Sequence, residues 1–409
     1  MKGVLVILDG LGDLPNRQLD GKTPLEAAET PNLDFFSNRG EMGYVYPLNI
    51  GAIPGTDESI VSLFGNDVGF STRGQLEAVG TDIDLKRGDL SFRANFATID
   101  SLKKGNVLDR RAGRTLITKE AQILAKEINK IQLPCKFIFK PTIQHRAVLV
   151  FRGGFSDEIV GNDIMIDRKH VESNIFVKTL EDDENAQYTV NIVNEFLEKA
   201  YEILKNHPVN QKRKEKGLLP ANFILLRGPG TEPPKLSFYR KWLCIADVPV
   251  IKGFAKISGM KLFSFKYPKL KKLDVYETIH KGLKKMCKVS IKTLKRNYKK
   301  YDYAYIHIKA TDIPGHDNKP LEKKAMIEYI DKTLFNFLRK FAPSKKIKIA
   351  VTGDHSTPCK LKDHSADPVP LLLYNDSIPK EKKFSENEAR KGKLGRVMGK
   401  NFLEKIKFT

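Results

Sequence analysis

The chain has 409 residues, of which 41% are hydrophobic and 29% are charged. This composition excludes a chain that is disordered throughout, and the length exceeds that of one ordinary core, for which about 150 residues is typical. Lys and Arg number 71 against 49 Asp and Glu, which gives a formal net charge of +22. Lysines crowd residues 261–300 and 380–407 without a nucleic-acid-binding motif, so we favour a solvated basic surface over nucleic acid binding.

The apolar runs are short, and the cysteines are far apart. No run approaches the roughly 18 apolar residues that a membrane-spanning helix needs, and the N-terminus does not resemble a secretory signal. Because no Cys-x-x-Cys pair occurs, a disulfide framework or a structural zinc site is not expected. The four cysteines are Cys135, Cys244, Cys287 and Cys359. We therefore expect a reduced, cytoplasmic protein that does not enter a membrane, and nothing in the sequence predicts an oligomeric state.

Three apolar runs, each typical of a buried strand, end close to an acidic residue. They are residues 3–8 before Asp9, residues 303–308 before Asp312 and residues 347–352 before Asp354. Apolar residues at helical spacing over 321–341 predict a helix between the last two strands, and this order indicates a parallel sheet. Because open α/β sheets bind ligands beyond the carboxyl ends of their strands, we expect the three carboxylates to converge.

The pattern changes between residues 96 and 217. Its predicted elements are strand-like runs at 148–151 and 188–193 and a polar helix near 190–205. We therefore expect a discontinuous core formed by residues 1–95 and 218–409, with residues 96–217 inserted as a second domain. The apolar run 222–228 is expected to be the strand with which the core resumes.

Three of the eight histidines follow the last two strands. His316 comes after Asp312, His355 follows Asp354 directly, and His364 lies in the same loop. Each histidine alone is more often a loop or core residue. Together with the carboxylates, they form a typical ligand set for a divalent metal such as Mn²⁺, Mg²⁺, Co²⁺ or Zn²⁺.

A second element is the Ile-Pro-Gly turn at residues 53–55, which is followed by Thr56, Asp57, Glu58 and Ser59. The acidic residues indicate the first turn of a helix. A hydroxyl at this place is more often an N-cap than a nucleophile. Beside a divalent cation, however, it becomes a candidate alkoxide, because the cation makes its deprotonation accessible near neutral pH.

These residues together resemble the alkaline phosphatase superfamily. Further segments are similar to the archaeal type of cofactor-independent phosphoglycerate mutase. They are residues 8–12, 21–28, 30–34, 73–78, 92–98, 109–114, 226–230 and 251–254. The resemblance covers nearly the whole chain. It implies an α/β fold with an alkaline-phosphatase-like three-layer core, a mostly parallel sheet and an inserted α+β lid domain.

The resemblance also implies two divalent cations at the carboxyl edge of the sheet. One would be bound by Asp312, His316 and His364. The other would be bound by Asp9, Asp354, His355 and the nucleophilic hydroxyl, which falls on Thr56. Two residues depart from the family pattern, because Thr56 stands where most relatives carry Ser, and Ile60 stands where they tend to carry His. Ser59 stays open as the rival nucleophile.

The implied activity is the interconversion of 3-phosphoglycerate and 2-phosphoglycerate through a phosphothreonine, with manganese as the expected metal and no free 2,3-bisphosphoglycerate. Water must be kept off this intermediate, so the inserted domain is expected to be a lid. Guanidinium groups match carboxylates and phosphates. The expected substrate-binding residues are Arg110, Arg111 and Arg114 from the lid and Arg227 and Lys252 from the core side. Arg73, Arg93, His145 and Arg146 remain without an assigned role.

Two alternatives stay open. A phosphatase, phosphodiesterase or phosphopentomutase would use the same metal ligands. A catalytically silent polyanion-binding protein would instead use the lysines of residues 261–300, and its binding would depend on salt and not on a chelator.

Overall fold

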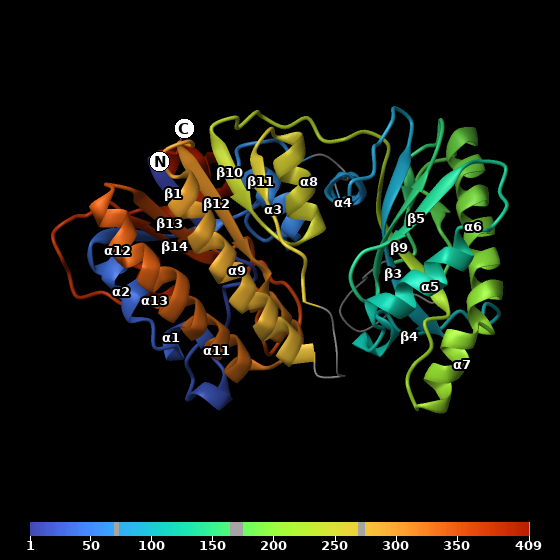
Figure 1. The fold of residues 1–409 in the computed structure, drawn as a ribbon, viewed down its shortest axis with the longest axis horizontal. Coiled ribbons are helices and arrows are strands. Elements are labelled where there is room, and N and C mark those ends of the chain that lie inside the picture. Colours follow the sequence, from blue (N-terminus) through green and yellow to red (C-terminus); the bar gives the residue numbers. More distant parts are fainter. Residues whose placement is uncertain (69–72, 164–174, 269–274, 409) are drawn as a thin grey trace. The chain divides into compact units, whose positions relative to one another are not determined.

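The structure is a computed structural model that describes residues 1–68, 73–163, 175–268 and 275–408. It forms two compact units (Figure 1). The first unit consists of Met1–Val68, Lys235–Pro268 and Tyr276–Thr409, and the second of Gly69–Pro234 and Lys269–Val275. The second unit is thus inserted in the sequence of the first. None of the helices in the described ranges is long and apolar enough to cross a bilayer.

The first unit is built on an eight-stranded sheet. In spatial order its strands are β11 (Lys261–Phe263), β10 (Trp242–Ile245), β12 (Tyr303–Ile308), β1 (Gly3–Leu8), β13 (Lys348–Thr352), β14 (Val369–Tyr374), β2 (Gly40–Tyr46) and β15 (Gly395–Met398). The first five strands are parallel to one another, β14 is antiparallel to both of its neighbours, and β15 is parallel to β2. The predicted mostly parallel sheet is confirmed.

Helices surround this sheet. They are α1 (Pro24–Ala27), α2 (Pro31–Asn38), α3 (Thr56–Leu63), α8 (Pro249–Ile257), α9 (Val275–Asn297), α10 (Asp312–His316), α11 (Pro320–Ile330), α12 (Asn336–Ser344), α13 (Glu386–Arg390) and α14 (Phe402–Ile406). Short turns of other helix types are η1 (Arg17–Leu19), η3 (Lys309–Thr311), η4 (Asp331–Phe335) and η5 (Gly399–Asn401). The helix predicted over residues 321–341 is confirmed as α11 and α12, which the π-helical turn η4 joins.

Helices cover both faces of the sheet. Tyr305 of β12 is paired with Leu5 of β1. Tyr374 of β14 is paired with a residue of β13, and that residue is paired with the residue of β1 that precedes Leu5. Since successive residues of a strand point to opposite faces, the two tyrosines lie on opposite faces. Phe36 of α2 packs on Tyr374 with ring centroids 5.0 Å apart, and Phe64, which follows α3, packs on Tyr305 at 5.1 Å. The first unit therefore has the three layers that were predicted.

The strand register also explains where the site lies. β1 is hydrogen-bonded to β12 on one side and to β13 on the other, and all three run in the same direction. Leu8 is paired with Ile308, and Ile7 is paired with Thr352. The residues that follow the three strands therefore emerge together at one edge of the sheet.

The second unit contains an antiparallel sheet in which β3 (Leu90–Ile99) is central. Its other strands are β4 (Val107–Asp109), β6 (Arg146–Phe151), β5 (Phe137–Pro141) and β9 (Phe223–Gly230). A separate pair is formed by β7 (Ile159–Val160) and β8 (Lys178–Thr179). The helical elements are α4 (Arg73–Gly80), η2 (Ala112–Arg114), α5 (Thr118–Ile128), α6 (Glu184–Lys205) and α7 (Pro208–Glu215).

Two details of the second unit differ from the sequence prediction. The run 222–228 does form a strand, but it pairs with β3, so it belongs to the second sheet and does not restart the core sheet. The run 188–193 is not a strand, because it lies inside α6. It is rich in β-branched residues, yet Val190, Val193 and Leu197 are buried at helical spacing, and this packing outweighs the strand propensity.

Candidate active site

The three predicted carboxylates converge at the carboxyl edge of the first unit's sheet. Asp9 directly follows β1, Asp312 begins α10 after β12, and Asp354 follows β13. All three are buried, with at most 3% of each residue exposed. Buried carboxylates this close together are costly unless positive charge accompanies them, so the cluster requires cationic partners.

The first group of possible metal ligands consists of Asp312, His316 and His364, whose ligand atoms lie within 4.8 Å of one another. The Nε2 atoms of His316 and His364 lie 3.5 Å and 3.7 Å from Asp312 Oδ1. The Nδ1 atom of His316 lies 3.0 Å from the carbonyl oxygen of Lys362, and that of His364 lies 2.8 Å from the carbonyl oxygen of Pro54. A carbonyl only accepts, so both imidazoles donate from Nδ1, and in the neutral form of each ring the unprotonated atom is the Nε2 that faces the carboxylate.

The second group gathers around His355. Its Nε2 atom lies 3.3 Å from Asp354 Oδ2, 3.4 Å from Asp9 Oδ1 and 3.4 Å from Thr56 Oγ1. Asp354 Oδ1 accepts hydrogen bonds from backbone N–H groups, whereas the buried Oδ2 has no hydrogen-bond partner among the described residues. An unpartnered carboxylate oxygen that faces an imidazole nitrogen fits a divalent cation in its donor chemistry.

Thr56 is the first residue of α3 and is buried. The helix begins after Gly55, so the acidic residues lie in its first turn as the sequence indicated, and the N–H of Gly55 donates to Glu58 Oε2 at 2.9 Å. The rival nucleophile Ser59 is also buried, but its hydroxyl forms no hydrogen bond with any described residue. Of the two hydroxyls, only that of Thr56 has a recorded contact with His355.

The local electrostatics give two of the carboxyl groups, those of Asp9 and Asp354, very different pKa values. Burial raises the pKa of Asp9, but the ammonium of Lys309 and the contact with His307 outweigh this effect and hold it at about 2. Burial and the neighbouring charge of Asp9 raise the pKa of Asp354 well above its ordinary value. Burial, together with His364, lowers the pKa of His355 well below 6.5, so this imidazole is neutral at neutral pH, as metal ligation requires.

Two residues of the site were missed by the sequence analysis. His307 of β12 lies 2.8 Å from Asp9 Oδ2, and its other ring nitrogen contacts the hydroxyl of Tyr305. Lys309 bridges Asp9 and Asp312, with its Nζ atom 2.9 Å from an oxygen of each. The signal in the sequence was a histidine within a predicted buried strand and a lysine immediately after its end, three residues before Asp312.

The predicted substrate-binding residues are divided between the units. Lys252 lies in α8 of the first unit, whereas the four arginines lie in the second. Arg227 was expected from the core side, but it belongs to β9 and therefore to the second sheet. Arg110 donates to Asp163 at 2.7 Å, and Arg227 lies 3.9 Å from the other oxygen of the same carboxylate. Arg111 and Arg114 lie at the turn η2.

The second unit also gathers positive charge around Arg93 and His145, two buried residues whose role was left open. Burial and the charges of Arg227 and Arg73 lower the pKa of Arg93, although Glu77 at 4.0 Å opposes them. Burial and several nearby arginines, beginning with Arg146, lower the pKa of His145 well below 6.5. Such an accumulation of like charge favours an anionic ligand.

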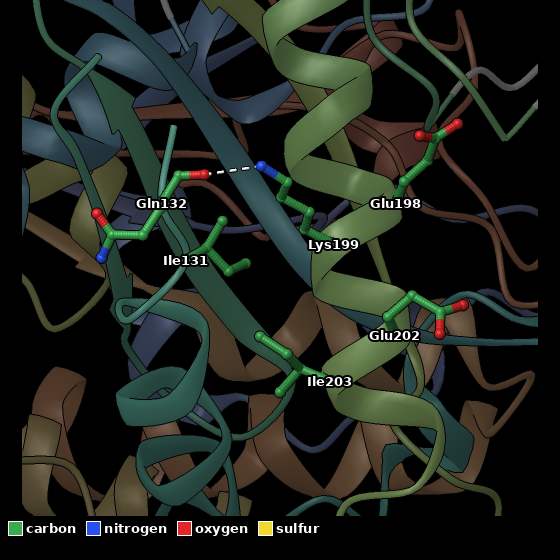
Figure 2. Close-up of a pocket in the computed structure, with 6 residues that line it drawn as sticks. All are labelled: Ile131, Gln132, Glu198, Lys199, Glu202 and Ile203. Atoms are coloured by element: carbon green, nitrogen blue, oxygen red, sulfur yellow. Dashed lines mark hydrogen bonds between the residues drawn. The ribbon is translucent and has the colours of Figure 1, made fainter. Parts of the chain in front are cut away.

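A groove of about 490 Å³ lies elsewhere in the second unit (Figure 2). Its lining residues are Ile131, Gln132, Glu198, Lys199, Glu202 and Ile203. Lys199 donates to the carbonyl oxygen of Gln132 at 2.9 Å. None of these residues belongs to the predicted site.

Comparisons with known proteins agree on one family. The profile of the family described as 2,3-bisphosphoglycerate-independent phosphoglycerate mutase matches residues 37–210. Proteins of that name from Pyrococcus abyssi and Archaeoglobus fulgidus are each 40% identical to this chain, and in both cases the match covers 98% of this chain and 96% of the relative.

Two solved structures are also similar. A structure described as the PH0037 protein from Pyrococcus horikoshii has a TM-score of 0.75 and 31% identity, and the match covers 100% of this chain and 98% of that one. A cofactor-independent phosphoglycerate mutase from Thermoplasma acidophilum has a TM-score of 0.58 and 30% identity, with 100% and 99% covered. The chain belongs to the family of 2,3-bisphosphoglycerate-independent phosphoglycerate mutases.

Proposed function

We propose that the protein interconverts 3-phosphoglycerate and 2-phosphoglycerate, a step of glycolysis and gluconeogenesis, through a phosphothreonine at Thr56. The observation that carries this proposal is the position of the Thr56 hydroxyl, 3.4 Å from Nε2 of His355, which itself belongs to a group of possible metal ligands with Asp9 and Asp312. Membership of the mutase family supports the choice of substrate. The cytoplasm remains the predicted location.

Two divalent cations are part of the proposal. The residues that would hold one of them are Asp312, His316 and His364, and those that would hold the other are Asp9, Asp354, His355 and Thr56. When bound, such cations neutralise the charge of a phosphoryl group and favour the alkoxide form of a neighbouring hydroxyl. The mixture of carboxylate and imidazole ligands accepts Mn²⁺, Mg²⁺, Co²⁺ or Zn²⁺, of which we propose Mn²⁺.

In the first transfer, Thr56 Oγ1 attacks the phosphorus atom of 3-phosphoglycerate in line with the leaving oxygen. An Oγ1–P bond forms as the bond from phosphorus to the C3 oxygen breaks; the hydroxyl of Thr56 gives up its proton and the departing C3 oxygen takes one up, so the proton count is unchanged. The resulting glycerate reorients, and its C2 hydroxyl takes the phosphoryl group back, losing its proton as Thr56 Oγ1 regains one. No free 2,3-bisphosphoglycerate is required, because the protein itself carries the phosphoryl group between the two transfers.

The second unit would bind the glycerate and exclude water. Residues Arg110, Arg111, Arg114 and Arg227, with Lys252 of the first unit, are the proposed contacts for carboxylate and phosphate groups. The positive charge around Arg93 and His145 supports an anion-binding role for this unit. A lid is needed because water that reached the phosphothreonine would turn the mutase into a phosphatase.

The test is to incubate the purified protein with Mn²⁺ and 3-phosphoglycerate and to measure both 2-phosphoglycerate and inorganic phosphate. Isomer formation with little phosphate release supports the mutase. Phosphate without isomer would establish the alternative, a metal-dependent hydrolase of the same superfamily. The polyanion-binding alternative would instead be supported if the protein showed no turnover but retained RNA, and if this retention fell with added salt and did not change with a chelator.

A further inference from the structure

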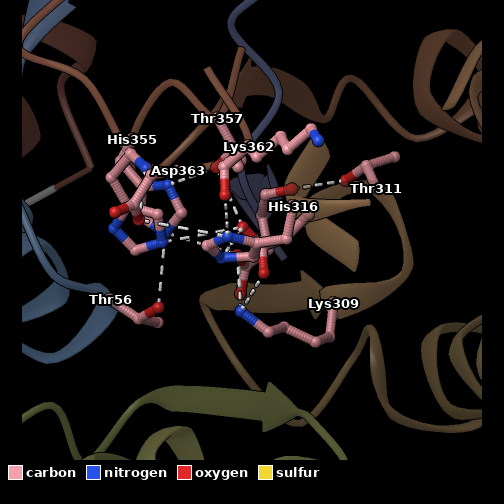
Figure 3. Close-up of polar contacts among 12 residues, drawn as sticks. Thr56, Lys309, Thr311, His316, His355, Thr357, Lys362 and Asp363 are labelled. Atoms are coloured by element: carbon pink, nitrogen blue, oxygen red, sulfur yellow. Dashed lines mark hydrogen bonds and ion pairs between the residues drawn. The ribbon is translucent and has the colours of Figure 1, made fainter. Parts of the chain in front are cut away.

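The three histidines of the site are oriented by different kinds of acceptor. His316 and His364 each donate from Nδ1 to a backbone carbonyl oxygen. The Nδ1 atom of His355 lies instead 3.0 Å from a side chain, the hydroxyl oxygen of Thr357 (Figure 3). A backbone carbonyl survives any side-chain substitution, whereas a hydroxyl does not. The role of the acceptor at His355 can therefore be tested directly.

The hydroxyl of Thr357 has a second partner. It donates to Asp312 Oδ1 at 2.8 Å, and since an ionised carboxylate can only accept, this bond uses the single hydroxyl proton. His355 must then donate from Nδ1, so in the neutral ring the unprotonated atom is Nε2, which faces Asp9 and Asp354. One hydroxyl thus connects a residue of the first ligand group with a residue of the second.

The surroundings of Thr357 hold this hydroxyl in place. The residue is fully buried, its N–H donates to the carbonyl oxygen of Gly12 at 3.0 Å, and its own carbonyl accepts from Lys323 Nζ at 3.0 Å. A Cβ atom at Gly10 would lie 2.6 Å from Thr357 Oγ1, and one at Gly315 would lie 2.8 Å from its Cγ2. The two glycines therefore make room for the threonine on two sides, and packing restrains its side chain.

We propose that Thr357 is a positioning residue that couples the two ligand groups, because its hydroxyl orients His355 and Asp312 at the same time. The inference rests on the two-cation site proposed above. A hydrogen-bond partner that orients a metal ligand is typically worth about 10–100-fold in metal affinity. Removal of this hydroxyl should weaken the binding of both cations, whereas removal of an ordinary buried hydrogen bond should weaken neither.

The experiment titrates metal-free protein with Mn²⁺ alone, by calorimetry and without substrate. Thr357→Val removes the hydroxyl at nearly constant side-chain volume, whereas Thr357→Ser keeps the hydroxyl and removes only the methyl group. The matched control is Thr352→Val, since Thr352 is equally buried and donates at 3.0 Å to the carbonyl oxygen of Pro370, not to a ligand side chain. The ¹⁵N resonances of His355 report its tautomer in each variant.

We expect Thr357→Val to bind Mn²⁺ about 10–100-fold more weakly at both sites and to lose the pure Nδ1–H tautomer of His355. Thr357→Ser should stay within about threefold of the wild type, and Thr352→Val should be unchanged. Wild-type affinity and tautomer in Thr357→Val would overturn the inference, and so would an equal loss in Thr352→Val. If Thr357→Val does not fold, the Mn²⁺ affinity and the His355 tautomer of Thr357→Ala are compared with those of Thr357→Ser, and equal values in these two variants would overturn the inference.

The two proposals fail in different ways. A wild-type protein that takes up no Mn²⁺ would overturn the two-cation site, and the role of Thr357 with it. A wild type that binds two ions, together with a Thr357→Val variant that binds them equally well, would overturn only the role of Thr357.

Discussion

The imidazole of His364 stacks on that of His355, with the ring centroids 3.6 Å apart and the ring planes inclined by 22°. Two imidazolium ions at this separation would repel each other. Burial, together with His364, lowers the pKa of His355, and burial lowers that of His364 although Asp312 opposes it. Both rings are therefore held in the neutral form that binds metal.

This stacking leads to a prediction about pH. In the unfolded chain His355 titrates near its ordinary pKa of about 6.5, and in the folded protein it titrates lower, so below this pH the unfolded state binds more protons. The contribution of His355 to stability is thus present above pH 6.5 and is lost as the pH falls. We expect metal-free His355→Gln to lose less stability than the wild type between pH 7.5 and 5.5, as measured by urea unfolding. Parallel pH profiles would contradict this expectation.

The nucleophile is tested by removing each hydroxyl in turn. Thr56→Ala should reduce kcat by about 10³-fold or more, because the phosphoryl acceptor is lost, while Thr56→Ser should retain activity. Ser59→Ala is the matched control and should stay within about tenfold of the wild type. Fragmentation mass spectrometry of the phosphopeptide from a quenched reaction should place the phosphate on Thr56 itself. A phosphorylated Ser59 would transfer the role to that residue.

Metal dependence is tested by chelation and by ligand removal. A chelator should abolish turnover, and Asp354→Ala or His364→Ala should lose both bound Mn²⁺ and activity. The control is His280→Ala, because His280 is 40% exposed in its side chain and contacts Glu322 at 3.0 Å, outside the ligand groups. Elemental analysis after dialysis gives the metal content. Full turnover by a metal-free preparation would refute the proposed site.

The arginines of the second unit are tested through Arg227. Arg227→Gln removes a charged side chain that we propose as a donor to the substrate, and we expect kcat/KM for 3-phosphoglycerate to fall about 10–100-fold, the effect of one hydrogen bond to a charged group. Phosphate release should rise relative to isomer formation. Arg87→Gln, at an exposed arginine of the same unit, is the control. If both variants behave alike, Arg227 has no specific role in binding.

A buried ion pair beside the site gives a prediction about stability. Lys323 and Asp13 lie 2.8 Å apart, both side chains are fully buried, and the lysine also donates to carbonyl oxygens of Gly12 and Thr357. Lys323→Met leaves a buried carboxylate without its cation, which typically costs about 3–5 kcal/mol. Lys281→Met, at an exposed pair with Glu277, should cost less than about 1 kcal/mol. Urea unfolding of the two variants measures the difference.

The ligands at the sheet edge could be predicted because their positions follow from a rule about parallel strands. Asp9, Asp312 and Asp354 each come soon after an apolar run, so their convergence required only that the strands be neighbours. His307 and Lys309 could not be found in this way. A lone histidine in an apolar strand is usually a core residue, and only the strand order shows that Asp9 is beside it.

The errors lay where local sequence does not determine the partner. The strand over residues 222–228 was recognisable, but nothing in its composition distinguished the first sheet from the second. Residues 188–193 combine strand propensity with helical spacing, and the surrounding helix decides between them. Arg227 lies in the strand over residues 222–228, so the wrong assignment of this strand to the core sheet also placed Arg227 on the core side.

The strand order also dictates when this protein is able to fold during its synthesis. Both neighbours of β1 come after residue 300 of the chain, and so do most of the ligands that surround Asp9. When the nascent chain has left the ribosome as far as residue 300, the whole second unit has been synthesised. The apolar residues of β1 are then still exposed, because neither of the strands that pair with β1 has been synthesised. Chaperone contact at residues 3–8 should persist until the final hundred residues emerge.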